Sequence, residues 1–473
     1  MASVEIGSTG RNSARVVDVR TLATKVQQPS DTEAVTTTNV ITASESGTRF
    51  VLNSATAFVS TLPLPAAGLE YWFYIGATEP TTTHTVVTSA SANIIVGNIS
   101  TTEDALVNGV TNLRSGKGAI YIQSSGNGYK SNPNGDCSGS FTCTETIADN
   151  LSTVPYIIQV GSLDATGFVS SYTTPGAALW ISGFGGEYGN NTSHSGINAP
   201  SGNKPAMMTT DQSTCSKGYT KTGVSAGSGK NYNAFNNGDH AENSSCNYTS
   251  TFNGTSSAAP TVAGVVALML EANPALTWRD VKHILATTAD QVGSDGDYSY
   301  TYTSIPQYEW EENAAGYKHH IWFGFGKIDA AEAINTAKTY TANSRGTFAA
   351  TTYKQNILNQ VINWGVNSTS TLAVTKPVGS NDFVEFVRVT VQFDHSVPRS
   401  VGLRLESPQG TVVNIMQPFT NIGTNPSTTV FDIGVSAFYG ENIEGNWTIA
   451  ANDYVNDSQF GSLLKYGIQI YGN

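Results

Sequence analysis

The chain has 473 residues, which is too long for one ordinary domain and predicts two or three. Charged residues make up only 13%, with 24 Lys plus Arg against 36 Asp plus Glu, so the formal net charge is −12. This acidic balance excludes a phosphate-binding surface, and nucleic acid is not an expected partner. The hydrophobic share of 39% excludes wholesale disorder.

Residues 1–102 are predicted to form a β-rich module. Strand-like runs lie at Arg49–Leu52 and Tyr71–Ile75, with a Leu-Pro-Leu-Pro turn between them, and Asn93–Val96 adds a short strand. The first forty residues have weak periodicity and are predicted to form an extended arm. The run FVLNSATAFVSTLPLPAAGLEYWFYIGA resembles small β-modules of tailed-phage structural proteins, and this resemblance implies a place on a virion.

Residues 103–345 change character. A helix is expected over Glu103–Leu113, and apolar runs at Ala119–Gln123 and Pro155–Ser162 are typical of buried parallel strands. After Pro260 the chain reads TVAGVVALMLEAN, which is apolar on every face and predicts a buried helix. Thr277 and Asp280 predict a capping box for the next helix. The fold class of this part is therefore α/β.

Ser256 lies where this apolar helix begins. A serine at a helix N-terminus sits in a positive field, which stabilises negative charge on a bound carbonyl. The simpler interpretation is that Ser256 only caps the helix. The residues alone leave both interpretations open.

The segment Gly254-Thr255-Ser256-Ser257-Ala258-Ala259-Pro260, with LEANPALTWRDVKHIL after it, resembles the nucleophile segment of the subtilases, most of all the kexin and proprotein-convertase branch. The resemblance implies that Ser256 is a nucleophile. It also implies that Asn127, within Ser-Gly-Asn-Gly, donates its amide to the oxyanion, an interaction worth about 3 kcal/mol.

The family's other two triad motifs are missing. A subtilase carries an Asp before a Gly and a His in an H-G-T turn, and this sequence contains neither. We therefore expect only the C-terminal half of a catalytic domain. His240, which follows Asp239, is the one alternative base near Ser256; His283 is expected to be structural, and the pair His319-His320 to split between a buried and an exposed face.

Four cysteines allow three pairings, and local spacing favours Cys137–Cys143 and Cys215–Cys246. Disulfides predict an oxidising compartment, either extracellular or on a particle released by lysis, because no secretory leader precedes the first charges. By the family resemblance, Asp136 matches a calcium-binding acid, but Thr174 stands where a second acid is expected. Calcium is the only cofactor that the resemblance suggests.

Residues 346–473 are predicted to be an all-β jelly-roll sandwich. Val387–Phe393 and Val401–Leu405 alternate with period two, and Gly445–Ile449 and Leu464–Tyr471 add further strands. The pattern L-x-L-x-S-P-x-G-T, followed by G-x-W, resembles the P domain (Homo B) that follows the protease in convertases.

Two functions compete on this basis. The first is a protease-derived structural protein on a virion, not proteolytic by itself, with capsid subunits or copies of itself as partners. The second is a kexin-like endopeptidase whose Asp and His come from another chain or an upstream segment, with a peptide substrate. Since no run of eighteen apolar residues occurs, no membrane span is expected.

Overall fold

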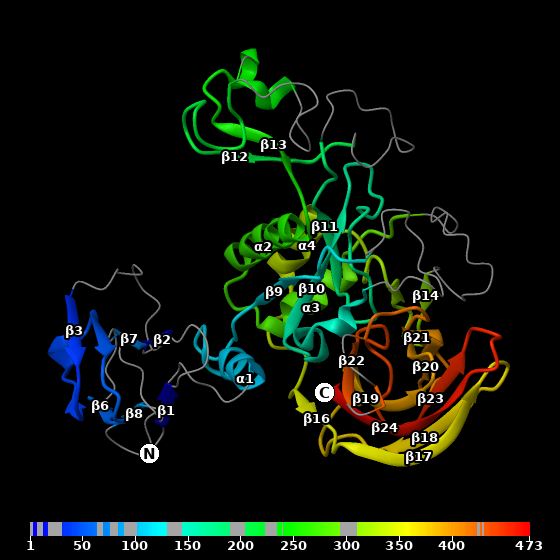
Figure 1. The fold of residues 1–473 in the computed structure, drawn as a ribbon. Coiled ribbons are helices and arrows are strands. Elements are labelled where there is room, and N and C mark those ends of the chain that lie inside the picture. The colour runs from blue at the N-terminus through cyan, green and yellow to red at the C-terminus, as the bar shows by residue number, and fades with distance from the viewer. Residues whose placement is uncertain are drawn as a thin grey trace. The chain divides into compact units, whose positions relative to one another are not determined.

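The structure is a computed structural model, and it divides into two compact units, residues 1–118 and 119–473, which are described separately (Figure 1). The part that it describes comprises residues 3–6, 13–17, 31–63, 70–75, 84–88, 102–129, 144–189, 204–222, 234–238, 240–293, 310–422, 426–427 and 430–473. The second unit contains both the α/β part and the C-terminal sandwich. The boundaries expected near residues 102 and 345 stay predictions.

The N-terminal unit is built from two four-stranded sheets, in the orders β1-β8-β6-β4 and β2-β7-β5-β3. From β3 to β8 the chain places successive strands alternately in the two sheets, and strands within a sheet are parallel, as in a short β-solenoid. Phe50, Leu52 and Phe73 are fully buried in its core. The strands are β1 (Ser3–Ile6), β2 (Ser13–Val17), β3 (Asp31–Val35), β4 (Asn39–Val40), β5 (Thr48–Leu52), β6 (Val59–Leu62), β7 (Glu70–Ile75) and β8 (His84–Thr88).

The expected N-terminal arm is wrong for the described residues. β1 pairs with β8 and β2 pairs with β7, so these two segments are strands within the sheets and not a free arm. Alternating Val and Thr residues give little periodicity, yet they suit a pleated, half-buried strand. The strand expected at Asn93–Val96 lies outside the described residues. Helix α1 (Thr102–Asn112) confirms the expected helix and belongs to this unit.

A three-stranded parallel sheet forms the α/β part of the C-terminal unit. Its order is β11-β10-β9, from β9 (Tyr121–Ser124), β10 (Ile157–Leu163) and β11 (Ile181–Phe184). Both expected parallel strands are confirmed, and β10 is buried as predicted, whereas the four residues of β9 are only half-buried. Helix α2 packs against all three strands and against α4. The remaining elements are η2 (Thr146–Ala148), η3 (Asn150–Thr153), β12 (Met207–Thr210), η5 (Ala234–Asn237), η6 (Ala241–Asn243), β13 (Tyr248–Phe252), α2 (Thr255–Ala272), α3 (Trp278–Thr287), β14 (Glu311–Glu312), β15 (Lys318–His319) and α4 (Ala330–Thr339).

Helix α2 differs from its prediction. Only 33% of the helix is buried, although it is apolar nearly all round. By length and composition α2 could cross a membrane, and the core helices of soluble domains meet the same criterion. Its contacts with β9, β10 and β11 are those of a domain helix. The capping box of α3 is confirmed: Asp280 N donates to Thr277 Oγ1 over 3.2 Å, and Thr277 N donates to Asp280 Oδ2 over 2.8 Å.

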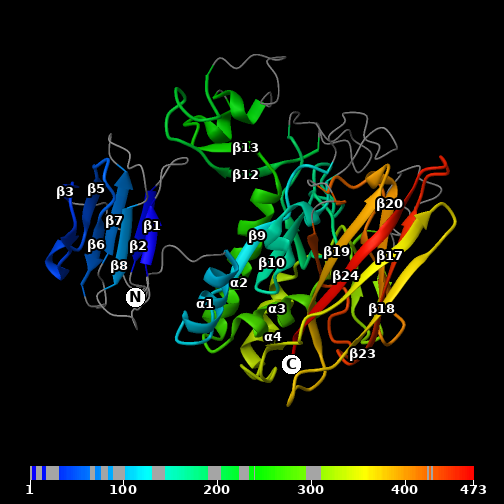
Figure 2. The ribbon, with the colours of Figure 1, turned by 60° about the horizontal axis from the view of Figure 1, so that its bottom comes forward.

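The C-terminal part is a β-sandwich of two antiparallel sheets around one core (Figure 2). One sheet has the order β16-β24-β19-β22, with β17 also on β24, and the other has the order β18-β23-β20-β21. The four expected strand runs fall in β19, β20, β23 and β24. The jelly-roll connection stays a prediction. The strands are β16 (Ala349–Ala350), β17 (Lys354–Asn363), β18 (Ser368–Val374), β19 (Val384–His395), β20 (Val401–Glu406), β21 (Val412–Met416), β22 (Phe431–Val435), β23 (Gly445–Asp453) and β24 (Phe460–Gly472).

Buried polar groups join the sandwich to the α/β part. Arg279 on α3 donates from Nε to both carboxylate oxygens of Glu385 on β19, over 3.0 and 3.1 Å. Gly434 on β22 packs so closely that a Cβ there would lie 2.0 Å from the Ser152 carbonyl oxygen. Arg388 on β19 donates from Nε to Thr153 O over 2.8 Å, while Lys282 donates to Pro155 O over 2.7 Å within the α/β part. The contacts between the two parts agree with their belonging to one compact unit.

Glu145 is a buried titratable group at this junction. Its carboxylate accepts a hydrogen bond from the backbone N–H of Gln417 over 3.3 Å. Burial raises the pKa of Glu145 to about 8, against 4.5 for the free side chain. The folded unit therefore holds a proton on Glu145 that the unfolded chain releases, so this group's contribution to stability is present below about pH 4.5 and is lost as pH rises to about 8.

We expect Glu145→Gln to remove this loss, because glutamine keeps the shape and cannot ionise. The variant should melt only slightly differently from the wild type at pH 5, and at pH 8 it should melt higher, by about 2–4 °C for each kcal/mol gained. Thermal unfolding at both pH values checks this. Glu312→Gln, at an exposed pair with Lys318, is the control. A pH-independent difference between the melting temperatures of Glu145→Gln and wild type would contradict the expected titration.

Candidate functional site

Ser256 is the second residue of α2 and is exposed. The N-cap is Gly254, with φ +111°, and it makes no side-chain cap bond. The interpretation that Ser256 only caps the helix is therefore wrong. A residue with a Cβ is strained at this φ, so Gly254 is required where the strand turns into the helix. The Gly254 N–H donates to the Tyr172 hydroxyl over 2.8 Å.

Asn127 lies beside this turn, although it precedes Thr255 by 128 residues. Its Oδ1 accepts hydrogen bonds from both the N–H and the hydroxyl of Thr255, each over 2.8 Å. A Cβ on Gly254 would lie 3.2 Å from Asn127 Nδ2. Because Oδ1 is engaged by Thr255, the NH₂ end of the amide is the end available to a ligand at Ser256.

A short hydrogen-bond network holds the Asn127 loop. Thr255 Oγ1 accepts from Gly126 N over 3.2 Å, and Thr174 Oγ1 accepts from Gly128 N over 3.1 Å. Thr174 N also donates to Gly126 O over 3.0 Å. The positioning roles of Thr255, Thr174 and Tyr172 were not predicted from the sequence. For Thr255 a signal existed, because it stands directly before the candidate nucleophile.

The arrangement can stabilise an anion next to Ser256. The N-terminal amides of α2 and its dipole supply positive potential, and the Asn127 amide supplies a directed donor. Deprotonating the serine requires a base within hydrogen-bond reach. In the described part of the chain, no hydrogen bond joins Ser256 to a histidine.

The described histidines of the α/β part are engaged elsewhere. His240 Nδ1 accepts from Glu242 N over 3.3 Å, and its ring packs on Phe235. His283 bonds the Tyr439 hydroxyl, and burial lowers the pKa of His283 to about 4. Asp239, the expected partner of His240, lies outside the described residues.

His319 and His320 are both buried, contrary to the expected split between two faces. His319 Nε2 bonds Leu179 O over 2.9 Å, and His320 Nδ1 accepts from Trp322 N over 3.1 Å. His320 lies in the turn after β15, and its ring packs against the ring of Trp310. The alternation of buried and exposed side chains along a strand therefore does not extend to His320.

The sandwich contains a serine, a histidine and an aspartate close together, and the aspartate is distant from the other two in sequence. Ser400 Oγ lies 3.5 Å from His395 Nδ1, and His395 Nε2 lies 3.6 Å from Asp453 Oδ2. All three side chains are buried, and the Ser400 hydroxyl donates to Val397 O over 2.9 Å. A substrate has no access to this trio, so we assign it a structural role.

Two buried carboxylates, Asp164 and Glu187, lie in the segments that follow β10 and β11. Asp164 pairs with Lys204 over 2.8 Å. Glu187 accepts from the N–H and the hydroxyl of Ser171, over 2.6 and 2.9 Å, and burial raises the pKa of Glu187 to about 7. Neither residue was predicted from the sequence, because an isolated acid in a loop carries no signal of burial.

Asp136, Cys137 and Cys143 lie outside the described residues, so the calcium and the first disulfide stay predictions. Within the described ranges, no group of three or more His, Cys, Asp or Glu side chains could hold a metal ion.

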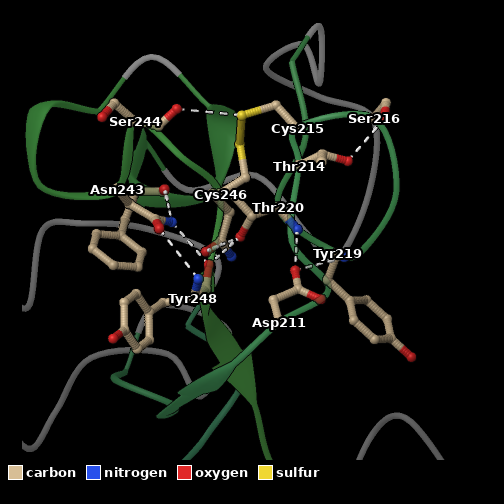
Figure 3. The surroundings of a disulfide bond; sticks show 12 residues. Asp211, Thr214, Cys215, Ser216, Tyr219, Thr220, Asn243, Ser244, Cys246 and Tyr248 are labelled. Atoms are coloured by element: carbon tan, nitrogen blue, oxygen red, sulfur yellow. Dashed lines mark hydrogen bonds between the residues drawn. A yellow bond between two sulfur atoms is a disulfide. The ribbon is translucent and has the colours of Figure 1, made fainter.

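The Cys215–Cys246 disulfide is confirmed (Figure 3). It closes a finger, which we define as the described residues between 204 and 253, and β13 leads from this finger directly into Gly254. The side chains buried inside the finger are mostly polar: Thr220, Asn236, Asn243 and Thr249. Asp211 Oδ2 accepts from Tyr219 N and Thr220 N, over 2.8 and 2.7 Å. Hydrogen bonds and the disulfide, rather than an apolar core, therefore hold the finger.

Replacing both Cys215 and Cys246 with serine is expected to destabilise the finger by about 3–4 kcal/mol, because the bond closes a separation of 31 residues. Limited proteolysis should then cut within 211–248 much faster than in the wild type. The rest of the C-terminal unit should retain its melting temperature. Equal cleavage rates in both proteins would contradict this.

Comparison with known families gives the wider context. The model of the subtilase family matches residues 3–317. The chain belongs to the subtilase family. The model of the proprotein convertase P-domain matches residues 384–470, so the C-terminal sandwich of this subtilase is a P domain. The subtilase match also includes the N-terminal unit, and the resemblance of that unit to phage modules stays a prediction.

Curated relatives are proteases of this family. The Aeromonas extracellular serine protease of Aeromonas sobria is 29% identical over 393 residues, which cover 74% of this chain and 57% of the relative. Proprotein convertase subtilisin/kexin type 7 of Homo sapiens is 27% identical over 385 residues, covering 78% and 39%. Furin-1 of Xenopus laevis is 23% identical over 374 residues, covering 78% and 39%. This chain thus spans roughly two-fifths to three-fifths of their lengths.

Among solved structures, the serine protease of Aeromonas sobria matches with a TM-score of 0.64 at 25% identity, covering 78% of this chain and 68% of that chain. These comparisons favour the protease interpretation of the sequence over the virion interpretation.

Proposed function

We propose that this chain is the nucleophile-bearing part of a kexin-like serine endopeptidase. Ser256 is the nucleophile, and Asn127 donates to the oxyanion. The Asp and His of the triad come from a second polypeptide or from a segment that precedes residue 1. The observation that carries the proposal is the turn itself: Ser256 is exposed and does not cap its helix, and Thr255 orients the Asn127 amide.

The chemistry of the proposed reaction divides between the two parts. This chain would hold the scissile carbonyl between Ser256 and Asn127 and stabilise its oxyanion. The serine proton must pass to a histidine that an acid orients. We propose that the P domain supports the nucleophile part through the Arg279–Glu385 and Glu145–Gln417 contacts, and that the protein works outside the cytoplasm. Its disulfide and the extracellular Aeromonas relative support this location.

Covalent labelling by a fluorophosphonate tests the proposal. The purified chain alone is expected to show no stoichiometric labelling, because an unassisted serine hydroxyl is a weak nucleophile. Ser256→Ala is the control. Labelling of the wild-type chain that is lost in Ser256→Ala would place a base inside the chain and overturn the division of the triad. His240→Ala would then test whether His240 is that base.

A second candidate function concerns the N-terminal unit, which is a compact solenoid of its own. We propose that it attaches the chain to a particle such as a virion. Deleting residues 1–101 should abolish sedimentation with that particle and leave the labelling behaviour of Ser256 unchanged. Continued sedimentation of the deletion variant with the particle would refute the attachment role.

A further inference from the structure

The outward side of α2 is apolar where a surface helix is normally polar. Val262, Val266 and Met269 on the inner side are buried in the core. Charged and polar residues usually cover the opposite face of such a helix, so that only a stripe is apolar. Here the exposed positions between Ser256 and Glu271, which are both exposed themselves, form a stripe of small and apolar residues. We define it as the outer α2 stripe: Pro260, Ala263, Gly264, Ala267 and Leu268.

The outer α2 stripe lies on the same side of α2 as the proposed nucleophile, Ser256. Its members recur at helical spacing from Ser256, so all of them share one side of the helix with it. The Leu268 side chain is 48% exposed. A Cβ on Gly264 would meet no atom within 4 Å. Because the side chains are small, another helix could approach this backbone closely and end beside Ser256.

A second, independent feature is the edge of the sheet. β9 lies at the end of the β11-β10-β9 order, and among the described strands it pairs only with β10. All four of its side chains are half-buried, and Ile122 packs against the core. An edge strand with apolar side chains is a template for another strand.

A buried hydroxyl without a partner marks the end of the same strand. Ser125 follows β9 directly and is only 7% exposed, and its Oγ has no hydrogen-bond partner among the described residues. A buried polar atom in this state indicates a missing neighbour. In both views α2 and β9 lie on the side of the C-terminal unit that faces away from the sandwich strands β17 and β18 (Figures 1 and 2).

We propose that the outer α2 stripe and the free edge of β9 form one docking surface for the polypeptide that carries the catalytic histidine. That partner presents an extended strand to β9 and a small-faced helix to α2, and so delivers its histidine to Ser256. The proposal rests on the proposed function. Three observations favour this occupant: Ser256 ends the stripe, the described histidines of the α/β part are engaged elsewhere, and the curated relatives are longer than this chain.

The test mixes the full chain with one probe, the part of the Aeromonas sobria extracellular serine protease that precedes its match to residue 119. Sedimentation should detect a one-to-one complex, and hydrogen exchange should slow in the β9 and α2 peptides. Ala263→Arg and Leu268→Arg should each weaken binding at least tenfold. Ile357→Arg, at a residue 74% exposed on β17, is the matched control and should bind like the wild type. Melting temperatures verify that all variants fold.

The outcomes separate the two proposals. A complex that needs the stripe and makes Ser256 reactive to fluorophosphonate supports both. A stripe-dependent complex without labelling supports the docking surface and overturns the proposed protease function. If Ala263→Arg and Leu268→Arg leave labelling or binding unchanged, the docking surface is overturned. The absence of any complex at roughly 100 μM probe also overturns it, because a specific complex is expected to have a Kd of about 1 μM.

Discussion

Replacing Glu385 with glutamine is expected to lower the free energy of unfolding of the C-terminal unit by about 3–5 kcal/mol. The Glu385 carboxylate faces the buried guanidinium of Arg279, and Arg345 Nε lies 3.7 Å from it. Removing the anion leaves cationic groups enclosed without their counter-charge. Such a loss is much larger than that from an exposed ion pair, because water no longer solvates the remaining charges.

Denaturant unfolding measures this loss directly. Glu312→Gln is the matched control, because the Lys318–Glu312 pair lies 3.9 Å apart with both side chains largely exposed. It should change stability by less than about 1 kcal/mol. A Glu385→Gln loss as small as that of the control would show that water reaches the junction and that the two parts are only loosely joined.

Replacing Asn127 with alanine is expected to slow acylation of Ser256 by about 10²–10³-fold in a complex where the triad is complete. Alanine removes the donor to the oxyanion together with the acceptor that holds Thr255 N and Oγ1. Asn127→Asp separates these effects, because aspartate keeps the acceptor and lacks the NH₂ group. It should be at least as slow as the alanine variant.

The rate of fluorophosphonate labelling at saturating partner concentration checks this prediction. Asn108→Ala, on α1 away from the nucleophile turn in sequence, tests for nonspecific effects of removing an amide. Labelling of Asn127→Ala and Asn127→Asp within about threefold of the wild type would show that backbone amides of α2 alone stabilise the oxyanion.

Local patterns predicted the positions of elements better than their environments. The strands around Tyr121 and Ile157, helix α1 and the Thr277 capping box follow from residues adjacent in the chain. The exposure of α2 does not, because apolar residues on every face indicate burial only if something covers each face. That covering is a property of the assembly, and periodicity within the helix cannot specify it.

Contacts between distant residues were accessible only in part. The family resemblance identified Asn127 and Ser256, and the spacing of four cysteines favoured the Cys215–Cys246 pair. The burial of Glu145 and Lys282 gave no sequence signal, because charged residues are mostly exposed. Their burial depends on segments more than a hundred residues away in the chain. The N-terminal solenoid was also missed, since successive strands alternate between two sheets, while local patterns show only short β runs.

The junction between the two halves of the C-terminal unit sets the order in which the chain can fold during synthesis. Arg279 leaves the ribosome 106 residues before its partner Glu385, and Glu145 leaves 272 residues before the Gln417 amide. At about 5–20 residues per second, the interval for Arg279 alone is roughly 5–20 s. Until then Arg279 lacks the carboxylate with which it pairs in the folded unit, so the junction between the nucleophile half and the P domain forms only after Glu385 has been synthesised.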